Sequence, residues 1–248
     1  MLPLILPPDR QAPLHVLCLG AHADDIEIGC GGTMLRLLSE RRNVHVTWVV
    51  FSATGQREAE AHAGASQFLE GTADRRVMVQ RFRDGFFPWQ GGEIKEFMES
   101  LKREVEPDLI FTHFREDRHQ DHRTISELTW NTWRRHMVLE YEVPKYDGDL
   151  GAPNCFVPLQ QAICAHKAAL ICRVFRSQSD KSWLCEETFE SMLRLRGLEC
   201  AAPDKHAEAF HCRKFVLGVE AERVGQGATN HAPAPTANLP AQAGQGVY

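Results

Sequence analysis

The stretch Leu14–Leu38, LHVLCLGAHADDIEIGCGGTMLRLL, changes from apolar to polar and back to apolar. Its first residues, LHVLCL, predict a buried strand. From Gly32 onward apolar residues recur at helical spacing, and Gly29, Gly31 and Gly32 are expected to let the backbone turn closely into this helix. Between strand and helix lies GAHADD, residues 20–25, with one imidazole and two adjacent carboxylates. Because open α/β sheets bind ligands beyond the carboxyl ends of their strands, the stretch predicts a polar site there.

A second polar cluster, THFREDRHQDHR at residues 112–123, follows the short apolar run LIF at residues 109–111. That run predicts another buried strand. The carboxyl ends of parallel strands meet at one edge of a sheet. We therefore expect the two clusters to form a single site.

The rest of the chain alternates between strand and helix patterns. Further strands are expected at 44–51, 77–82, 138–143 and 212–219, and helices at 57–69, 93–104, 124–135, 159–175 and 187–196. The Gly- and Pro-containing segment 144–158 is expected to be a loop. This pattern predicts an α/β fold, a Rossmann-like, mostly parallel sheet flanked by helices, as a single domain over residues 1–224. From 225 to 248 the composition shifts to Ala, Pro, Gly, Gln and Asn, which predicts a flexible tail.

Composition excludes some classes of partner. A chain of 248 residues with 43% hydrophobic and 25% charged residues fits one large domain. Its net charge of −5 gives no reason to expect nucleic acid or an anionic membrane as partner. The eight cysteines are spaced irregularly, which favours buried thiols in a reducing compartment. No apolar run is long enough to span a bilayer, so a cytoplasmic location is expected.

The two polar clusters together resemble a known family. His22-Ala23-Asp24-Asp25, followed by Gly31-Gly32-Thr33 and paired with HQDHR at residues 119–123, resembles the PIG-L/LmbE-like zinc-dependent N-deacetylases. The resemblance extends through Arg57-Glu58, Asp84-Gly85, Pro107-Asp108 and Ala207-Glu208-Ala209-Phe210, so it covers nearly all of the chain before the tail. One departure is Ala23, where the family usually has proline. The family implies a hydrolase that removes an N-acyl group, above all N-acetyl, from an amino sugar or an amino-sugar conjugate.

The resemblance, position by position, assigns His22, Asp25 and His122 as ligands of Zn²⁺, with another divalent metal left open. Such a ligand set suits a hydrolytic zinc site, which keeps a position for water. Asp24 is expected to take a proton from that water, and His119 to stabilise the oxyanion and protonate the leaving amine. Asp121 is expected to pair with His119, fix its tautomer and raise its pKa. The resemblance also implies that Arg57 and Asp84, at the same sheet edge, hold the sugar.

Each residue also has a purely structural interpretation. His22 alone is typical of a hydrogen-bonded histidine at a strand end, an interpretation that we favour for His113. Asp117 is expected to be a loop residue or to support a ligand, and Arg57 can instead pair with Glu58 or Glu60 of its own helix.

Three other functions also remain open. One is a zinc amidase for a non-sugar or thiol conjugate, and another is a relative that binds acyl sugars without turnover. A nucleotide-binding protein is the third, because Gly29–Thr33 is glycine-rich, although its spacing is not the dinucleotide fingerprint. The substrate is expected to be a small molecule. The sequence leaves its identity and the formation of a homo-oligomer undecided.

Overall fold

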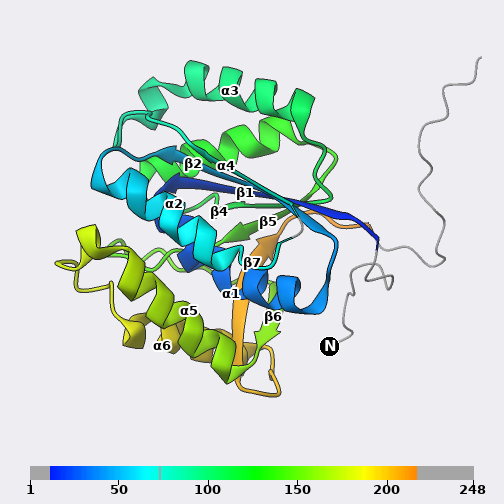
Figure 1. The fold of residues 1–248 in the computed structure, drawn as a ribbon, viewed down its shortest axis with the longest axis vertical. Coiled ribbons are helices and arrows are strands. Elements are labelled where there is room, and N and C mark those ends of the chain that lie inside the picture. Colours follow the sequence, from blue (N-terminus) through cyan, green and yellow to red (C-terminus); the bar gives the residue numbers. More distant parts are fainter. Residues whose placement is uncertain (1–11, 73, 217–248) are drawn as a thin grey trace, which may run out of the picture. The chain divides into compact units, whose positions relative to one another are not determined.

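Five adjacent parallel strands make up most of a seven-stranded sheet, and two further strands, joined through antiparallel pairing, complete one side (Figure 1). The computed structural model describes residues 12–72 and 74–216. In sheet order the strands are β3 (Asp74–Val79), β2 (Val44–Ser52), β1 (Leu14–His22), β4 (Leu109–His113), β5 (Met137–Tyr141), β7 (His206–Cys212) and β6 (Cys155–Leu159). The central strands are buried on both faces, which is why they read as continuous apolar runs.

Helices cover both faces of the sheet (Figure 1). One face carries α1 (Asp25–Glu40), α2 (Gln56–Phe68), α5 (Gln161–Val174) and α6 (Glu186–Glu199). The other carries α3 (Gly91–Glu104) and α4 (Gln120–Thr132). A separate apolar cluster fills the space between each helix layer and the sheet. The fold is therefore the predicted Rossmann-like α/β domain.

Strand order reverses direction beside β1. The chain runs outward from β1 to β2 and β3 on one side, and from β4 to β5 on the other. β1 pairs in parallel with both β2 and β4, so loops that leave β1 and β4 diverge to opposite faces. Such a topological switch point opens a crevice beyond the carboxyl ends of the strands. Both polar clusters leave the sheet at this point.

The glycines of the first stretch have a different role from the predicted one. Helix α1 begins at Asp25 rather than at Gly32, so these glycines lie inside the helix. A Cβ at Gly29 would come within 2.1 Å of the Tyr141 ring, and one at Gly31 within 2.5 Å of the Phe68 ring. The prediction that they form a turn was wrong: Gly29 and Gly31 let α1 pack closely against aromatic rings, and Gly32 lets it approach Leu159 and Glu208. No phosphate-binding glycine loop is formed by the residues described here.

The part of the chain after residue 143 contains the main errors of prediction. Segment 144–158 was expected to be a loop, yet its end forms the edge strand β6, which includes Pro158. An edge strand tolerates proline because one row of its backbone groups has no ladder partner. The last strand was expected at 212–219, but β7 spans His206–Cys212. The predicted tail, 225–248, lies outside the described residues.

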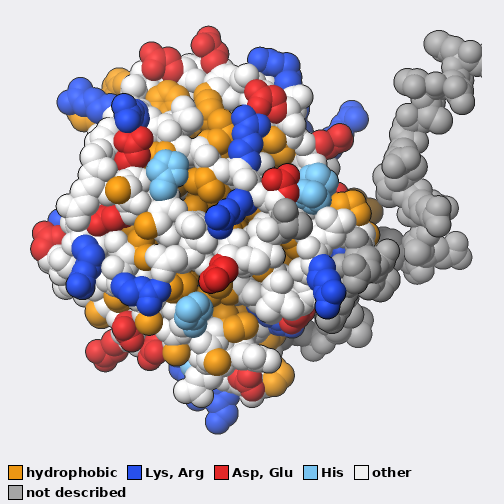
Figure 2. Space-filling model, viewed as in Figure 1, with side chains coloured by type: hydrophobic (Ala, Val, Ile, Leu, Met, Phe, Trp, Pro, Cys, Tyr) orange, Lys and Arg blue, Asp and Glu red, His pale blue; other side chains and the backbone are white. Residues whose placement is uncertain are grey.

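The surface carries charges of both signs. Figure 2 shows Lys and Arg side chains interspersed with Asp and Glu over one face of the molecule. On the described part of this face, no single sign dominates. Among the helices within residues 12–216, none combines the length and apolar character needed to cross a membrane.

Candidate active site

The connection between β1 and α1 carries three of the predicted site residues. His22 ends β1, Asp25 begins α1, and Asp24 between them is the N-cap residue with a positive φ of 96°. The backbone N–H of His22 donates to Asp25 Oδ2 at 2.6 Å, which closes this turn on itself. Ala23 is completely buried and its carbonyl accepts a 2.6 Å hydrogen bond from Arg57. The turn therefore keeps a defined shape without the proline that the family usually has there.

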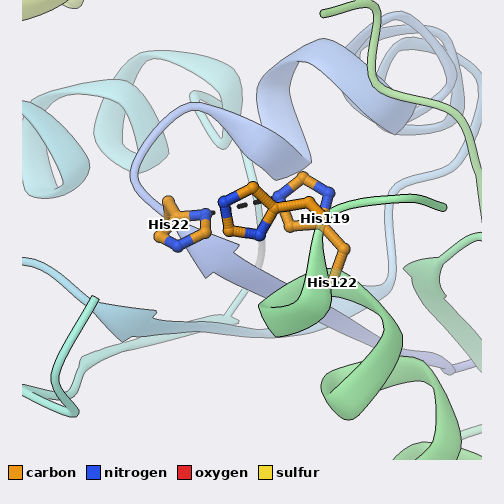
Figure 3. Close-up of side chains that lie close together, drawn as sticks. All are labelled: His22, His119 and His122. Atoms are coloured by element: carbon orange, nitrogen blue, oxygen red, sulfur yellow. Dashed lines mark hydrogen bonds between the residues drawn. The ribbon is translucent and has the colours of Figure 1, made fainter. Parts of the chain in front are cut away.

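The second cluster lies at the start of α4. His119 is the N-cap residue of this helix, and its Nδ1 accepts from the backbone N–H of Asp121 at 3.3 Å. His122 follows in the first turn, so α4 begins earlier than the predicted residue 124. Figure 3 shows His119 and His122 facing His22, which comes from the end of β1. The structure thus brings the two polar clusters together.

The three predicted metal ligands lie at nearly equal separations. His22 Nδ1 is 3.3 Å from His122 Nε2 and 3.4 Å from Asp25 Oδ2. His122 Nε2 is 3.4 Å from Asp25 Oδ1. Ligand atoms about 2.05 Å from a tetrahedral zinc ion lie about 3.3 Å from one another. His22, His122 and the Asp25 carboxylate are therefore close enough together to bind one divalent metal ion, with each histidine facing a different oxygen of Asp25.

Other donors extend this cluster. Within the described residues, three overlapping groups have donor atoms within 4.8 Å of one another: His22 with His119 and His122, Asp25 with His113 and His122, and His22 with Asp84 and Asp121. Because these groups overlap, they form one continuous cluster of imidazoles and carboxylates. Imidazole and carboxylate groups are ligands that divalent transition metals favour.

Carboxylates set the charge balance around the two histidine ligands. Burial lowers the pKa of His22, but hydrogen bonds to Asp121, Asp25 and Asp84 outweigh burial and hold it well above the usual value. Burial and the neighbouring His113 lower the pKa of His122 to about 4, so its ring is neutral, as metal binding requires. A cation placed among these carboxylates would take over the role that protonated His22 plays here.

Asp24 has the environment of a proton acceptor. Its side chain is buried, and burial raises its pKa to about 7, although the Arg57 guanidinium opposes the rise. Arg57 reaches Asp24 Oδ1 at 3.3 Å. A carboxyl group with a pKa near neutrality is well suited to general acid and base chemistry.

Asp121 contacts a different histidine from the one predicted. Its Oδ2 lies 3.3 Å from His22 Nε2, and its two oxygens accept the backbone N–H groups of Gly85 and Phe87 at 2.6 and 3.1 Å. The predicted pairing of the Asp121 carboxylate with His119 was wrong, because the 85–87 loop and His22 occupy both oxygens. The predicted rise in the pKa of His119 was also wrong: burial and the charge of His22 lower it. The tautomer of His119 is set by the Asp121 backbone, which leaves Nε2 as the N–H donor.

Several supporting residues escaped the sequence reasoning or were only partly assigned. His113 Nε2 accepts from the Ala21 N–H at 2.9 Å, which confirms the favoured hydrogen-bonding interpretation, and its ring stacks 3.9 Å from that of His122. Asp117 supports His122, as expected, through a 2.9 Å contact with Nδ1. Lys145 was not predicted, and it holds Asp117 Oδ2 at 2.8 Å. It lies in segment 144–158, which carried no motif.

The two predicted sugar-binding residues both reach the cluster. Asp84 Oδ1 lies 3.1 Å from His22 Nε2, while the Asp84 side chain is 67% exposed. The alternative in which Arg57 pairs within its own helix is wrong: Glu58 pairs with Arg81 instead, and Glu60 binds Gln56 and Ser177, leaving Arg57 to Asp24 and Ala23.

Comparison with known proteins now adds to this geometry. Residues 17–133 match the family model described as PIG-L: GlcNAc-PI de-N-acetylase. The matched segment contains both polar clusters. The chain is also 27% identical over 139 residues to an uncharacterised deacetylase, YaiS, of Escherichia coli K12, a match that covers 52% of this chain and 74% of YaiS. Both matches are to deacetylases, which are hydrolases.

Solved structures share the fold of this chain. The N,N'-diacetylchitobiose deacetylase of Pyrococcus horikoshii matches with a TM-score of 0.63 and 21% identity, over 81% of this chain and 84% of that one. GalB, the 4-carboxy-2-hydroxymuconate hydratase of Pseudomonas putida KT2440, matches with a TM-score of 0.67 and 16% identity, over 84% and 100% of the two chains. At these identities the likeness is one of fold, and the chemistry has to be argued from the site.

Proposed function

We propose that this protein is a zinc-dependent hydrolase that removes an N-acyl group, above all N-acetyl, from an amino sugar or an amino-sugar conjugate. The observation that carries the proposal is the close approach of His22, His122 and the Asp25 carboxylate, with donor-atom separations of 3.3 to 3.4 Å and each histidine facing a different carboxylate oxygen. Asp24 and His119 flank these three residues. The match of residues 17–133 to a de-N-acetylase family model supports the reaction type.

Zinc supplies a Lewis acid that polarises the amide carbonyl and lowers the pKa of water. His22, Asp25 and His122 would hold the ion. Asp117, through His122 Nδ1, fixes which nitrogen of that ring faces it. The surrounding carboxylates neutralise its charge.

The chain's own groups account for the proton transfers. Asp24 takes a proton from the attacking water as the water oxygen forms a bond to the amide carbon. The Nε2–H of neutral His119 donates a hydrogen bond to the oxygen that becomes negative in the tetrahedral intermediate. When the carbon–nitrogen bond breaks, Asp24 passes its proton to the leaving nitrogen. This last step was expected of His119, but burial and the charge of His22 lower the pKa of His119, so its neutral ring is less suited to that transfer. The products are a carboxylate, acetate for an N-acetyl substrate, and the free amine.

Arg57 and Asp84 are the groups that we assign to the sugar. A planar guanidinium and an exposed carboxylate are suited to holding adjacent hydroxyl groups. Both contact the cluster directly, since Arg57 reaches Asp24 and Asp84 reaches His22. A hydroxyl-bearing ring bound between them would therefore place its acylated nitrogen beside the metal.

Metal analysis of purified variants tests the ligand assignment. We expect about one zinc per chain in the parent, and loss of zinc in His22→Ala and His122→Ala. His62→Ala, on the exposed face of α2, is the matched control and should keep its zinc. Unchanged zinc in both ligand variants would overturn the assignment.

Acetate release tests the reaction and its substrate class. We expect the zinc-loaded protein to release acetate from N-acetylglucosamine conjugates, to stop after chelation, and to recover when zinc is restored. Reconstitution with other divalent ions shows whether zinc is required. Faster release from a non-sugar anilide than from any amino sugar would instead indicate an amidase of different specificity.

A further inference from the structure

The loop of residues 83–90, here called the aromatic loop, is fastened to the candidate active site at three points. Asp84 Oδ1 lies 3.1 Å from His22 Nε2. The N–H groups of Gly85 and Phe87 donate to the two carboxylate oxygens of Asp121 at 2.6 and 3.1 Å. Phe86 lies between two anchored residues, so its Cα is about 3.8 Å from each of theirs.

The aromatic loop is also closed on itself. The backbone N–H of Arg83 donates to Gln90 Oε1 at 2.7 Å, and that of Phe86 donates to the Arg83 carbonyl at 3.1 Å. Phe87 points inward: its side chain is completely buried and its ring lies 5.9 Å from the His22 ring. These contacts give the loop a defined shape before any ligand binds.

Two large aromatic side chains of the same loop are exposed. Trp89 is 73% exposed and Phe86 39% exposed, and their ring centroids lie 5.7 Å apart at 52°. The Arg83 guanidinium lies 3.6 Å from the Phe86 centroid and covers one face of that ring. A protein with a well-buried core leaves an exposed tryptophan beside a polar site chiefly where the ring has something to bind.

We propose that Phe86 and Trp89 form a subsite that binds the apolar face of a second ring, attached to the amino sugar whose acyl group is removed. This inference rests on the proposed function and narrows its substrate to a ring-bearing conjugate. The negative π-face of an aromatic ring attracts the partly positive C–H groups or ring edge of a partner. Asp84, exposed on the same loop, holds the sugar hydroxyls while the indole receives the adjoining ring.

The second ring could be a pyranose or an aromatic aglycone, since both present C–H groups to an indole. Three probes separate these cases: methyl N-acetyl-β-glucosaminide without a second ring, phenyl N-acetyl-β-glucosaminide, and N,N'-diacetylchitobiose. Dissociation constants are measured by calorimetry on the zinc-loaded protein in an Asp24→Asn background, which limits turnover. The tighter of the two ring-bearing probes identifies the kind of ring.

We expect at least one ring-bearing probe to bind about 10-fold more tightly than the methyl glycoside. Trp89→Ala should abolish this preference and leave the affinity for the methyl glycoside within about 2-fold, and Trp89→Phe should restore most of it. Phe86→Leu should reduce the preference partially. Phe215→Ala is the matched control, since Phe215 is 64% exposed and follows β7 at the amino-end edge of the parallel strands.

Three results would overturn the subsite. One is a parent without any preference for a second ring, which includes a parent that binds none of the probes. Another is a preference that survives Trp89→Ala. A third is an equal loss of affinity for all three probes, which would give Trp89 only a structural role. Acetate release by the parent from the same probes is judged separately: release without ring preference rejects only the subsite, and ring preference without release rejects only the deacetylase.

Discussion

Asp24 holds a backbone conformation that residues other than glycine rarely adopt, with φ at 96°. Strain of this kind persists where surrounding contacts over-determine it, and it is concentrated at functional sites. Here the Ile28 N–H donates to the Asp24 carbonyl at 2.9 Å, and Arg57 holds the preceding carbonyl of Ala23. The strained residue is the proposed proton acceptor, and its neighbour Asp25 is a proposed zinc ligand. The turn thus gives two adjacent carboxylates different environments.

Replacing Asp24 by asparagine tests its role as the base. Asn keeps the size of the side chain but does not accept a proton, so we expect kcat to fall by about 10²- to 10⁴-fold. Zinc content and melting temperature should stay near the parent values. Activity within a few-fold of the parent would assign the base to another group.

Asp84 provides the sharper test of sugar binding, because Arg57 also supports the Asp24 turn. Asp84→Ala should lower kcat/KM on an N-acetyl amino sugar by at least about 10-fold, or 1.4 kcal/mol. An acetanilide without hydroxyl groups should react almost as before. Asp74→Ala, an exposed carboxylate at the start of β3, is the control and should affect neither substrate. Equal losses on both substrates would show that Asp84 supports the metal site rather than the sugar.

At the scale of elements, α1 depends on glycine for its close approach to its neighbours. Gly29→Ala would place a Cβ 2.1 Å from the Tyr141 ring, whose hydroxyl donates to the Leu19 carbonyl at 2.7 Å inside the core. We expect this overpacking to destabilise the fold by about 1 to 3 kcal/mol in denaturant titrations. Gly92→Ala is the matched control: it lies in the first turn of α3 with open space around it. It should be neutral or slightly stabilising, and an equal loss in both variants would contradict the packing argument.

Features that depend on local sequence patterns could be predicted, whereas contacts between distant segments could not. The parallel strands and most helices were predictable because burial on both sheet faces leaves a local apolar signature. The meeting of His22, Asp25 and His122 at one edge was predictable from sheet topology, whereas their assignment as metal ligands came from the family resemblance and stays a prediction. The packing role of Gly29 and Gly31 was not predictable, because the Tyr141 and Phe68 rings that they contact come from distant segments. Two contacts were not predictable: that of Asp121 with His22 and that of Lys145 with Asp117. Both depend on loop conformations, which no local sequence pattern encodes.

At the scale of the whole molecule, a buried ion pair ties the C-terminal strand to α1. Glu208 of β7 accepts the backbone N–H groups of Gly32 and Thr33 at 2.7 and 2.6 Å. Lys167 of α5 donates to Glu208 Oε1 and to the Ile28 carbonyl, both at 2.6 Å. The pair replaces part of the internal hydrogen bonding of the helix that begins at Asp25. Three elements far apart in the chain therefore share one polar junction.

Breaking this junction should be costly. Glu208→Ala leaves a buried ammonium and two backbone N–H groups without their carboxylate, so we expect a loss of about 3 to 5 kcal/mol. Lys167→Met should cost less, because Glu208 keeps both backbone donors. Glu99→Ala, which removes the exposed Lys95–Glu99 pair on α3, is the control and should leave the free energy of unfolding nearly unchanged. Urea titrations measure the free energy of unfolding of each variant and so rank the three losses. Equal losses from the buried and the exposed pair would contradict the argument.

The junction also bears on the order in which the protein becomes active during synthesis. The carboxylate that receives the Gly32 N–H lies 176 residues further along the chain. A ribosome therefore releases both polar clusters of the active site long before the strand that completes α1. Domains tend to fold as units while the chain emerges. We therefore expect the proposed zinc site to become stable only after β7 has left the exit tunnel.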